Sequence, residues 1–427
     1  MNPKGRVLVT DPIDTCRAAL LVIRSLGGRG IGTSLMSQNF MVPSKFSRWS
    51  SESICCPDAT KNVEGFLETI FRHVRTGRYA SIFPLGDSTL EPISQHRGKI
   101  DPYTSLVLPS HESVMKALDK SKTLRAAEEL GIPAPETHYV KNAGEAAEVS
   151  KRIRYPVVIK SRQSYSWGQD GKASYTRPFY VNSASELVST YSRVERTFPE
   201  PMIQEYVPGH NINVALLFDN GEPRAVCMIR EDRTIPLTGG NSVMRQSIPL
   251  NHTLLKYSVD LLRSLNWHGV AEVEFKVDSR TLNPKLMEVN ARFWGSMNVA
   301  IDSGVDFPYL TYQLANGERI KPVFNYRSGV KYRWLNGDIA NLFSTMVGKS
   351  RIINTAPTDK IGTCIRFLRL YERNMHYDGL TLGDPLPFFM DEALFIVRNL
   401  RLLQRARAQP RDLAEDSVEE KTRNAYS

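Results

Sequence analysis

Apolar and charged residues alternate in two neighbouring segments near the middle of the chain, 271–278 and 286–293. Side chains of a β-strand point alternately to the two faces of a sheet, so this period of two predicts two strands, each with one apolar and one polar face. A turn is predicted between them, from Ser279 to Pro284. The predicted apolar face consists of Ala271, Val273, Phe275 and Val277 on the first strand and Met287, Val289, Ala291 and Phe293 on the second.

The polar face of this hairpin carries the most informative chemistry of the sequence. Pairing of the two strands is expected to place Glu274 opposite Glu288, with Asn290 one step along. Mg²⁺ prefers carboxylate and amide oxygens, and an arginine such as Arg292 can hold phosphate oxygens in a planar fork. An ordinary solvated hairpin is the alternative, but like charges that face each other across strands are unfavourable without a cation between them. The pattern therefore favours a metal and phosphate site.

Short apolar runs alternate with helical periodicity in residues 1–112, which predicts an open, Rossmann-like α/β domain. Strands are expected at Arg6–Thr10 and Tyr79–Pro84, with a helix from Thr15 to Leu26 between them. The dinucleotide fingerprint is missing, because Asp11-Pro-Ile-Asp14 stands where it would lie. The glycines of 28–32 follow the helix and are interpreted as a helix stop and turn.

The next segment is expected to contain a helix, a strand and a polar loop. Lys120 precedes a helical pattern that ends at Gly131. The apolar run 155–159 predicts a strand ending at Lys160, where a lysine can reach a phosphate beside the loop 161–172. This loop has few glycines and is a weak phosphate signal taken alone. A further strand is predicted from residue 202, and an amphipathic helix over residues 251–265.

A length of 427 residues is too great for a single small core and predicts two or three domains. The composition, with 41% hydrophobic and 23% charged residues, is typical of an ordinary globular protein. The sequence contains no run of about 18 consecutive apolar residues, so stable membrane insertion is not expected. A cytoplasmic location is expected instead. Five cysteines show no CxxC spacing, which argues against a zinc site or a disulfide framework.

The formal net charge of +10 is dispersed and accompanied by no nucleic-acid-binding motif, so nucleic acid is not an expected partner. The densest basic run, Arg398 to Arg407, is interleaved with leucines. A helix packed on the body with a solvated arginine face is the favoured interpretation, and a peripheral membrane contact is the less favoured one.

Taken in order, five motifs resemble the ATP-grasp superfamily over roughly residues 115–320. The segments around Arg230–Arg233, Pro236–Gly240 and Arg292–Ser296, with Asp302–Pro308, resemble its carboxylate-amine ligases. The five motifs are Asp119-Lys120, Pro156-Val-Val-Ile-Lys160, Ile203-Gln-Glu-Tyr-Val-Pro-Gly209, Glu272-Val-Glu-Phe275 and Met287-Glu-Val-Asn-Ala-Arg292.

This resemblance implies an α/β protein with the ATP-grasp fold, α+β in its nucleotide-binding part. The expected divisions are a pre-ATP-grasp α/β domain over 1–112, an ATP-grasp domain over 113–320 with lobes 113–205 and 206–320, a helical extension over 321–408 and a disordered tail over 409–427.

The resemblance also implies roles for individual residues. Lys120 and Lys160 would bind the ATP phosphates, and Arg292 the transferring phosphoryl group, while Arg245 would meet the substrate carboxylate. The metal ligands would be Glu274, Glu288 and Asn290, and the bound metal would be Mg²⁺ or, as a substitute, Mn²⁺. The nucleotide would be held by Gln204, Glu205, Val207 and Asn211.

Two departures from the family pattern affect the nucleotide site. Asn211 stands where the family usually has an acidic residue that binds the ribose, and the phosphate loop is poor in glycine. Tyr165 and Trp167 are suggested as a lid over the phosphates instead.

The implied reaction couples a small carboxylic acid to an amine, through an acyl phosphate, with release of ADP and phosphate. Alternatives are a non-catalytic ATP-binding regulatory protein and an ATP-dependent carboxylase. Dimerisation through the first domain is common among proteins that this chain resembles, so a homodimer is a possible assembly. The sequence identifies neither the carboxylic acid nor the amine.

Overall fold

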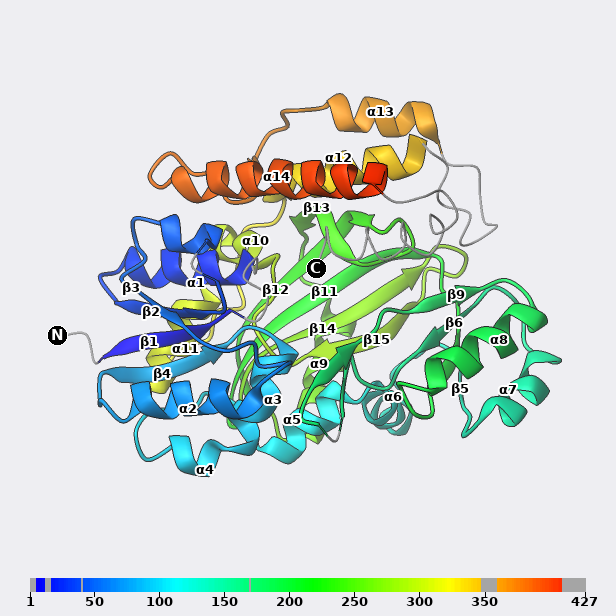
Figure 1. The fold of residues 1–427 in the computed structure, drawn as a ribbon, viewed down its shortest axis with the longest axis horizontal. Helices are drawn as coiled ribbons and strands as arrows, with labels where there is room; N and C mark the ends of the chain where they lie inside the picture. Colours follow the sequence, from blue (N-terminus) through cyan, green and yellow to red (C-terminus); the bar gives the residue numbers. More distant parts are fainter. Residues whose placement is uncertain (1–4, 12–16, 40, 169, 347–358, 409–427) are drawn as a thin grey trace.

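The computed structural model describes residues 5–11, 17–39, 41–168, 170–346 and 359–408. An N-terminal α/β unit, a small lobe and a large, mainly antiparallel sheet lie side by side, and three helices form a layer over one end of them (Figure 1). The predicted tail 409–427 and most of the loop at 11–14 lie outside the described residues.

The N-terminal unit contains a four-stranded parallel sheet in the order β3-β2-β1-β4. Helices lie on both of its faces, because the strands are apolar on both sides and need covering. The predicted strands are confirmed as β1 and β4, and the predicted helix as α1. The elements are β1 Arg6–Thr10, α1 Arg17–Gly27, β2 Thr33–Ser37, η1 Pro43–Phe46, β3 Glu52–Cys55, α2 Val63–Val74, β4 Tyr79–Pro84, α3 Asp87–Gln95, α4 Arg97–Ile100 and α5 His111–Leu118.

The small lobe is a four-stranded antiparallel sheet in the order β5-β10-β6-β9, packed on helices α7 and α8. Lys120 is the first residue of α6 rather than a residue before it, because Asp119 caps the helix by accepting from the backbone N–H groups of Ser121 and Lys122. The elements are α6 Lys120–Glu129, β5 Thr137–Tyr139, α7 Ala143–Ser150, β6 Val157–Lys160, β7 Tyr165–Trp167, β8 Ala173–Tyr175, β9 Phe179–Val181, α8 Ala184–Glu195 and β10 Met202–Glu205.

The large sheet has seven strands in the order β15-β14-β11-β12-β13-β16-β17. Gly209 begins β11 with φ +142°, and a Cβ there would lie 1.8 Å from the Val277 carbonyl oxygen, so only glycine lets β11 start against β14. The elements are β11 Gly209–Asp219, β12 Glu222–Ile235, β13 Asn241–Ser247, α9 His252–Ser264, β14 Gly269–Asp278, β15 Pro284–Asn290, α10 Met297–Ser303, α11 Phe307–Ala315, β16 Lys331–Arg333 and β17 Met375–Tyr377.

The C-terminal segment, predicted as helical, also contributes β16 and β17 to the large sheet. Each of these strands has three residues, too short to give an alternating pattern in the sequence. Its helices are α12 Leu335–Met346, α13 Lys360–Leu368 and α14 Leu386–Ala408, which form the layer at the top of Figure 1. Within the described residues, no helix combines the length and apolar character needed to cross a membrane.

Candidate active site

The predicted hairpin is formed by β14 and β15, and its pairing places Glu274 opposite Glu288 and Glu272 opposite Asn290. A bulge follows Glu274, so that Phe275 pairs with Leu286. Leu286 is therefore fully buried in the core in the place predicted for Met287, which is only half-buried. The rest of the predicted apolar face is buried except Val277, which is half-buried.

Carboxylates crowd together on the polar face of this hairpin. Asn290 Nδ2 lies 2.6 Å from Glu274 Oε1 and 3.3 Å from Glu272 Oε2. Burial raises the pKa of Glu274 well above its ordinary value, and the charges of Glu288 and Glu272 raise it further. Burial beside Glu231 raises the pKa of Glu272 to about 8. The carboxylates of the cluster therefore repel one another, and a bound cation would relieve this repulsion.

Two lysines approach the cluster from the small lobe. Lys120 Nζ lies 3.1 Å from Glu288 Oε2 and 3.3 Å from Ser164 Oγ. The Lys120 ammonium holds the pKa of Glu288 below its ordinary value despite burial. At the end of β6, burial and the positive charges of Lys120 and Lys276 lower the pKa of Lys160 to about 8, although Glu288 and Glu274 oppose the shift. Lys120 and Lys160 therefore both interact with Glu288.

Arg292 connects the hairpin to the N-terminal unit. Its Nε donates to Asp87 Oδ1 at 2.9 Å, and its Nη2 lies 3.4 Å from Asn290 Oδ1. Asp87 is the first residue of α3, at the carboxyl end of β4. Asp87 was not among the site residues predicted from the sequence, although it lies just after a parallel strand, where ligand-binding residues of α/β domains gather.

The β7–β8 hairpin extends from the small lobe to the N-terminal unit. Trp167 Nε1 donates to Glu91 Oε2 of α3 at 2.8 Å, and the Ala173 backbone N–H donates to the Thr60 carbonyl at 2.7 Å. Burial beside Asp87 raises the pKa of Tyr165 to about 12. These contacts connect the hairpin to the N-terminal unit, and the lid role suggested for Tyr165 and Trp167 stays a prediction.

The predicted hinge lies where β10 leads toward β11. Gln204 is buried, its Nε2 donates to Thr137 Oγ1 at 3.0 Å, and its Oε1 has no hydrogen-bond partner among the described residues. Glu205 forms an ion pair with Lys285, and Val207 is buried. An unpaired buried acceptor is costly, and an adenine amino group would supply the missing donor.

Asn211, the departure noted in the sequence, bonds to a carboxylate that the sequence argument did not single out. Its Nδ2 donates to Glu231 Oε2 at 2.9 Å, and Asn213 Nδ2 lies 3.2 Å from the other oxygen. Glu231 is buried on β12. It belongs to the charged run Arg230–Arg233, and this concentration of charge was the feature of the sequence that could have indicated a site residue there. A carboxylate is therefore present next to Asn211, supplied by the neighbouring strand.

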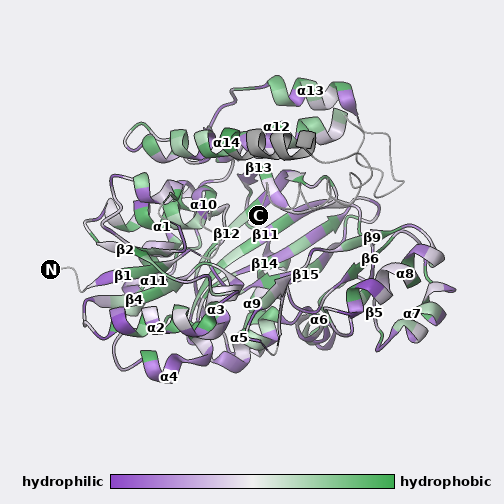
Figure 2. Ribbon diagram, viewed as in Figure 1, coloured by the Kyte–Doolittle hydropathy of each residue, from purple (hydrophilic) through white to green (hydrophobic). Residues whose placement is uncertain are grey.

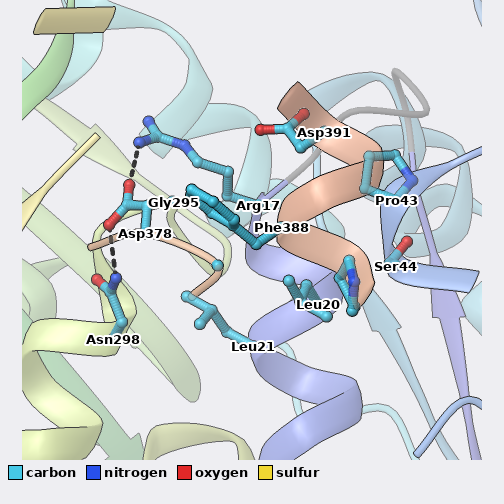
Figure 3. A pocket seen from close by; sticks show the side chains of 12 residues that line it. Arg17, Leu20, Leu21, Pro43, Ser44, Gly295, Asn298, Asp378, Phe388 and Asp391 are labelled. Atoms are coloured by element: carbon cyan, nitrogen blue, oxygen red, sulfur yellow. Dashed lines mark hydrogen bonds and ion pairs between the residues drawn. The ribbon is translucent and has the colours of Figure 1, made fainter. Parts of the chain in front are cut away.

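Arg245 does not reach the hairpin cluster; it lies on β13 opposite Glu231 and is fully buried. Its Nη2 lies 2.5 Å from Asp378 Oδ1 and 3.1 Å from Asn298 Oδ1. Arg17 Nη1 lies 2.6 Å from the other oxygen of Asp378, and Arg17 and Asn298 both point toward this carboxylate in Figure 3. A substrate carboxylate could replace Asp378 on Arg245 only if the segment after β17 moved.

Beside this ion pair lies a small pocket with a cavity volume of about 40 Å³, open to the surface between α1, α14 and the start of α10 (Figure 3). Leucines of α1 and Phe388 of α14 form its apolar wall, and Arg17, Asn298 and Asp378 its polar side. The pocket adjoins the segment that follows Arg292, since Gly295 is part of its lining.

The residue types of the hairpin are those that Mg²⁺ prefers, because Glu274 faces Glu288 across the strands and the Asn290 amide lies beside Glu274. Within the described residues, no three acidic, histidine or cysteine side chains are already arranged around a metal position. Asn290 presents Nδ2 to these carboxylates, so coordination through Oδ1 requires its amide to turn. Glu272 Oε1 is buried with no hydrogen-bond partner in the described chain, which adds a further acceptor in need of a cation or donor.

The sequence and fold were compared with those of known proteins. Residues 197–338 match the family model described as ATP-grasp in the biosynthetic pathway with Ter operon. This range contains the whole of β10, the β14–β15 hairpin and Arg245.

Two curated proteins are similar to part of this chain. The carbamoyl phosphate synthase large chain of Thermoanaerobacter pseudethanolicus is 25% identical over 249 residues, which cover 56% of this chain and 22% of that protein. The D-aspartate ligase of Enterococcus faecium is 24% identical over 245 residues, covering 53% of this chain and 58% of that protein. The chain thus matches less than two thirds of either relative.

Solved structures show the same fold. The biotin carboxylase of Campylobacter jejuni superposes with a TM-score of 0.60 at 17% sequence identity, over 76% of this chain and 74% of that chain. The superposition spans far more of the chain than the residues matched by the family model.

Proposed function

Because the chain has the ATP-grasp fold and resembles the carboxylate-amine ligases of that superfamily, we propose that it is an ATP-dependent ligase that joins a small carboxylic acid to an amine. The observation that carries the proposal is the hairpin cluster, in which Glu274 and Glu288 face each other beside Lys120 and Arg292. Crowded buried carboxylates cost free energy, and a structural role would not require them at one point.

In the proposed reaction, a carboxylate oxygen of the acid attacks the γ-phosphorus of ATP, and the bond to the β,γ-bridging oxygen breaks to release ADP. The amine then attacks the carbonyl carbon of the acyl phosphate, which loses phosphate and a proton to give the amide. Phosphoryl transfer needs positioning and charge neutralisation more than covalent help from the protein.

Each part of the site has a proposed task. Lys120 and Lys160 bind the phosphate oxygens, and Glu274, Glu288 and Asn290 hold Mg²⁺, which neutralises charge on the phosphates when it is bound. Arg292 is oriented by Asp87 and binds the transferring phosphoryl group. Gln204, Glu205, Val207 and Asn211 are proposed to hold the nucleoside, with Glu231 beside Asn211.

The pocket next to Arg17 is proposed to admit part of a substrate. It joins the segment after Arg292, and its wall combines apolar side chains with a guanidinium. We therefore expect a substrate with an apolar group, whereas Arg245 stays a predicted carboxylate ligand whose present partner is Asp378.

The test is Mg²⁺-dependent ADP release with pools of carboxylic acids, in the presence of hydroxylamine to trap an acyl phosphate as a hydroxamate. A pool that gives both ADP and hydroxamate supports the ligase. ADP release with bicarbonate and no amine would instead support the carboxylase, the alternative that the biotin carboxylase fold favours. ATP binding without turnover in any pool would favour a regulatory protein.

A further inference from the structure

Helix α12 turns polar side chains toward the body of the protein. Asp338 Oδ2 accepts from Arg333 Nε at 2.7 Å and from Arg233 Nη2 at 2.8 Å. Asn341 Nδ2 donates to the Thr234 carbonyl at 2.7 Å. These three partners of α12 lie on β12 and β16, so the helix is attached to the sheet mainly through charged and polar groups.

The opposite face of α12 is apolar and exposed. Ile339, Phe343 and Met346 follow one another at intervals of four and three residues, which puts them on one side of the helix. All three are exposed, Phe343 to 64%. An ordinary surface helix has the reverse arrangement, with its apolar stripe against the core and its polar side in water.

Helix α13 repeats this exposure beside α12. Lys360 Nζ donates to the Met346 carbonyl at 3.0 Å, which joins the start of α13 to the end of α12. None of the nine residues of α13 is buried, and Ile361, Ile365 and Leu368 share one exposed side of the helix. A helix this short is marginal alone in water, so burial of its apolar side would be a major source of stability.

Exposed apolar residues concentrate in this part of the chain. Fourteen of the twenty large hydrophobic residues that are exposed in the described structure lie between Ile339 and Val397. Figure 2 shows both hydrophobic and hydrophilic colouring on α12 and α13, the helices at the top of the view. Scattered apolar residues are normal on a protein surface, whereas such a concentration marks an interaction surface.

The charge exposed next to these residues is mainly positive. Lys360, Arg366, Arg369 and Arg373 are exposed, whereas Asp359 is the one exposed acid between residues 359 and 373. The Asp359 carboxylate accepts from the Gly362 backbone N–H at the start of α13 and pairs with Arg366 Nη1 at 3.3 Å, an exposed pair that leaves the net charge of these residues positive. Other acids of the layer, such as Asp338, Asp378 and Asp384, are paired with arginines of the body. The acids of the C-terminal segment thus pair inward with arginines of the sheet and of α1, while its basic residues face outward.

We propose that the outer apolar face of this layer binds peripherally to the surface of an anionic lipid bilayer. This outer apolar face consists of Ile339, Phe343 and Met346 of α12 and Ile361, Ile365 and Leu368 of α13. Apolar side chains enter the boundary between headgroups and acyl chains, and the flanking lysine and arginines meet the anionic headgroups. No membrane-spanning helix is needed.

Charge also distinguishes a bilayer from a second copy of the chain. A two-fold symmetric contact would bring the same four basic residues of each copy toward each other, which is repulsive. Anionic headgroups would neutralise them. The lipid surface is therefore the occupant that suits both the apolar and the charged groups.

The full chain is tested by cosedimentation with vesicles of phosphatidylcholine, with and without phosphatidylglycerol. We expect binding to the vesicles that contain phosphatidylglycerol, weakening as salt is added. Replacement of Arg366 and Arg369 by Ala should weaken it roughly 25-fold, since each basic residue near an anionic surface contributes about fivefold. The double variant Ile361→Ser/Leu368→Ser should abolish it.

The matched control is Leu282→Ser. Leu282 lies in the β14–β15 turn, outside the proposed face, and its exposed fraction of 75% is close to the 76% of Ile361. It should bind like the unaltered chain, and thermal unfolding should show that every variant is folded. Absence of binding to phosphatidylglycerol, or undiminished binding of the Ile361→Ser/Leu368→Ser variant, would overturn the proposal. A dimer in solution that this variant converts to a monomer would also overturn it, by assigning the face to a second copy.

Discussion

Arg292 Nε donates to Asp87 Oδ1 at 2.9 Å, so the arginine that follows β15 is held by the first residue of α3. The two residues are 205 positions apart in the sequence. This bond fixes one edge of the guanidinium and leaves Nη2 toward Asn290. The N-terminal unit therefore orients a side chain of the proposed phosphoryl-transfer site.

Replacement of Asp87 by Asn should lower kcat by roughly 10- to 100-fold, the usual effect of losing a group that orients a residue at a reaction centre. The KM for ATP should change less, because the lysines still bind the phosphates. Steady-state kinetics of ADP release measures both. Asp101→Asn, at a helical i,i+4 pair with Arg97, is the control and should leave both constants unchanged. Equal loss in the two variants would argue against a positioning role.

Replacement of Glu288 by Gln should reduce Mg²⁺-dependent turnover by more than about 100-fold, because a carboxylate ligand of the metal is lost. The fold should persist, since the substitution also removes repulsion with Glu274. ADP release and thermal unfolding are the measurements. Glu222→Gln, an exposed pair with Arg263, is the control. Unchanged turnover in Glu288→Gln would remove Glu288 from the metal site.

ATP affinity should fall as the pH rises through about 8. The pKa of Lys160 is lowered to about 8 by burial, so the side chain is charged below that pH and neutral above it. Phosphate binding favours the charged form, so above about pH 8 binding takes up a proton and weakens by up to about tenfold per pH unit.

The measurement is calorimetric titration with ATP below and above about pH 8, in two buffers of different ionisation enthalpy. Arginine keeps its proton throughout this range, so Lys160→Arg should bind with a flatter pH dependence. The same slope in both proteins would mean that another group titrates.

Replacement of Asn211 by Asp restores the acidic residue that is usual in the family and should nevertheless destabilise this chain. The new carboxylate would face Glu231, whose hydrogen bond from Asn211 would be lost, at a cost of roughly 1–3 kcal/mol. The double variant Asn211→Asp/Glu231→Gln exchanges donor and acceptor and should recover most of the loss. Thermal unfolding of all four proteins closes the cycle, and additive effects would exclude coupling.

The sequence predicted the hairpin and its polar face because a period of two is a local property of the chain. The pairing of Glu274 with Glu288 was expected from matching the polar faces of the two strands. In the structure it depends on the bulge after Glu274, because the register beside the turn would put Met287 opposite Glu274. The bulge after Glu274 could not be predicted, since Leu286 and Met287 are both apolar and either one could face the core. The strands β16 and β17 of the C-terminal segment could not be predicted either, because three residues are too few to show an alternating pattern.

The neighbours of the site residues depended on contacts between distant segments. Asp87 and Glu231 reach the site only when α3 and β12 are placed against the hairpin. The proposed roles of the lysines and hinge residues stay predictions, although the structure brings both Lys120 and Lys160 to Glu288.

By itself, the sequence determined the strands, the polar face and the order of motifs, because periodicity and spacing are carried by neighbouring residues. Only the tertiary structure decided that Arg245 is paired with Asp378 and that α12 exposes its apolar side. An amphipathic pattern shows that a helix has two different sides. Which side meets the protein depends on the charges of the surface beneath it, and here Arg233 and Arg333 hold the polar side inward.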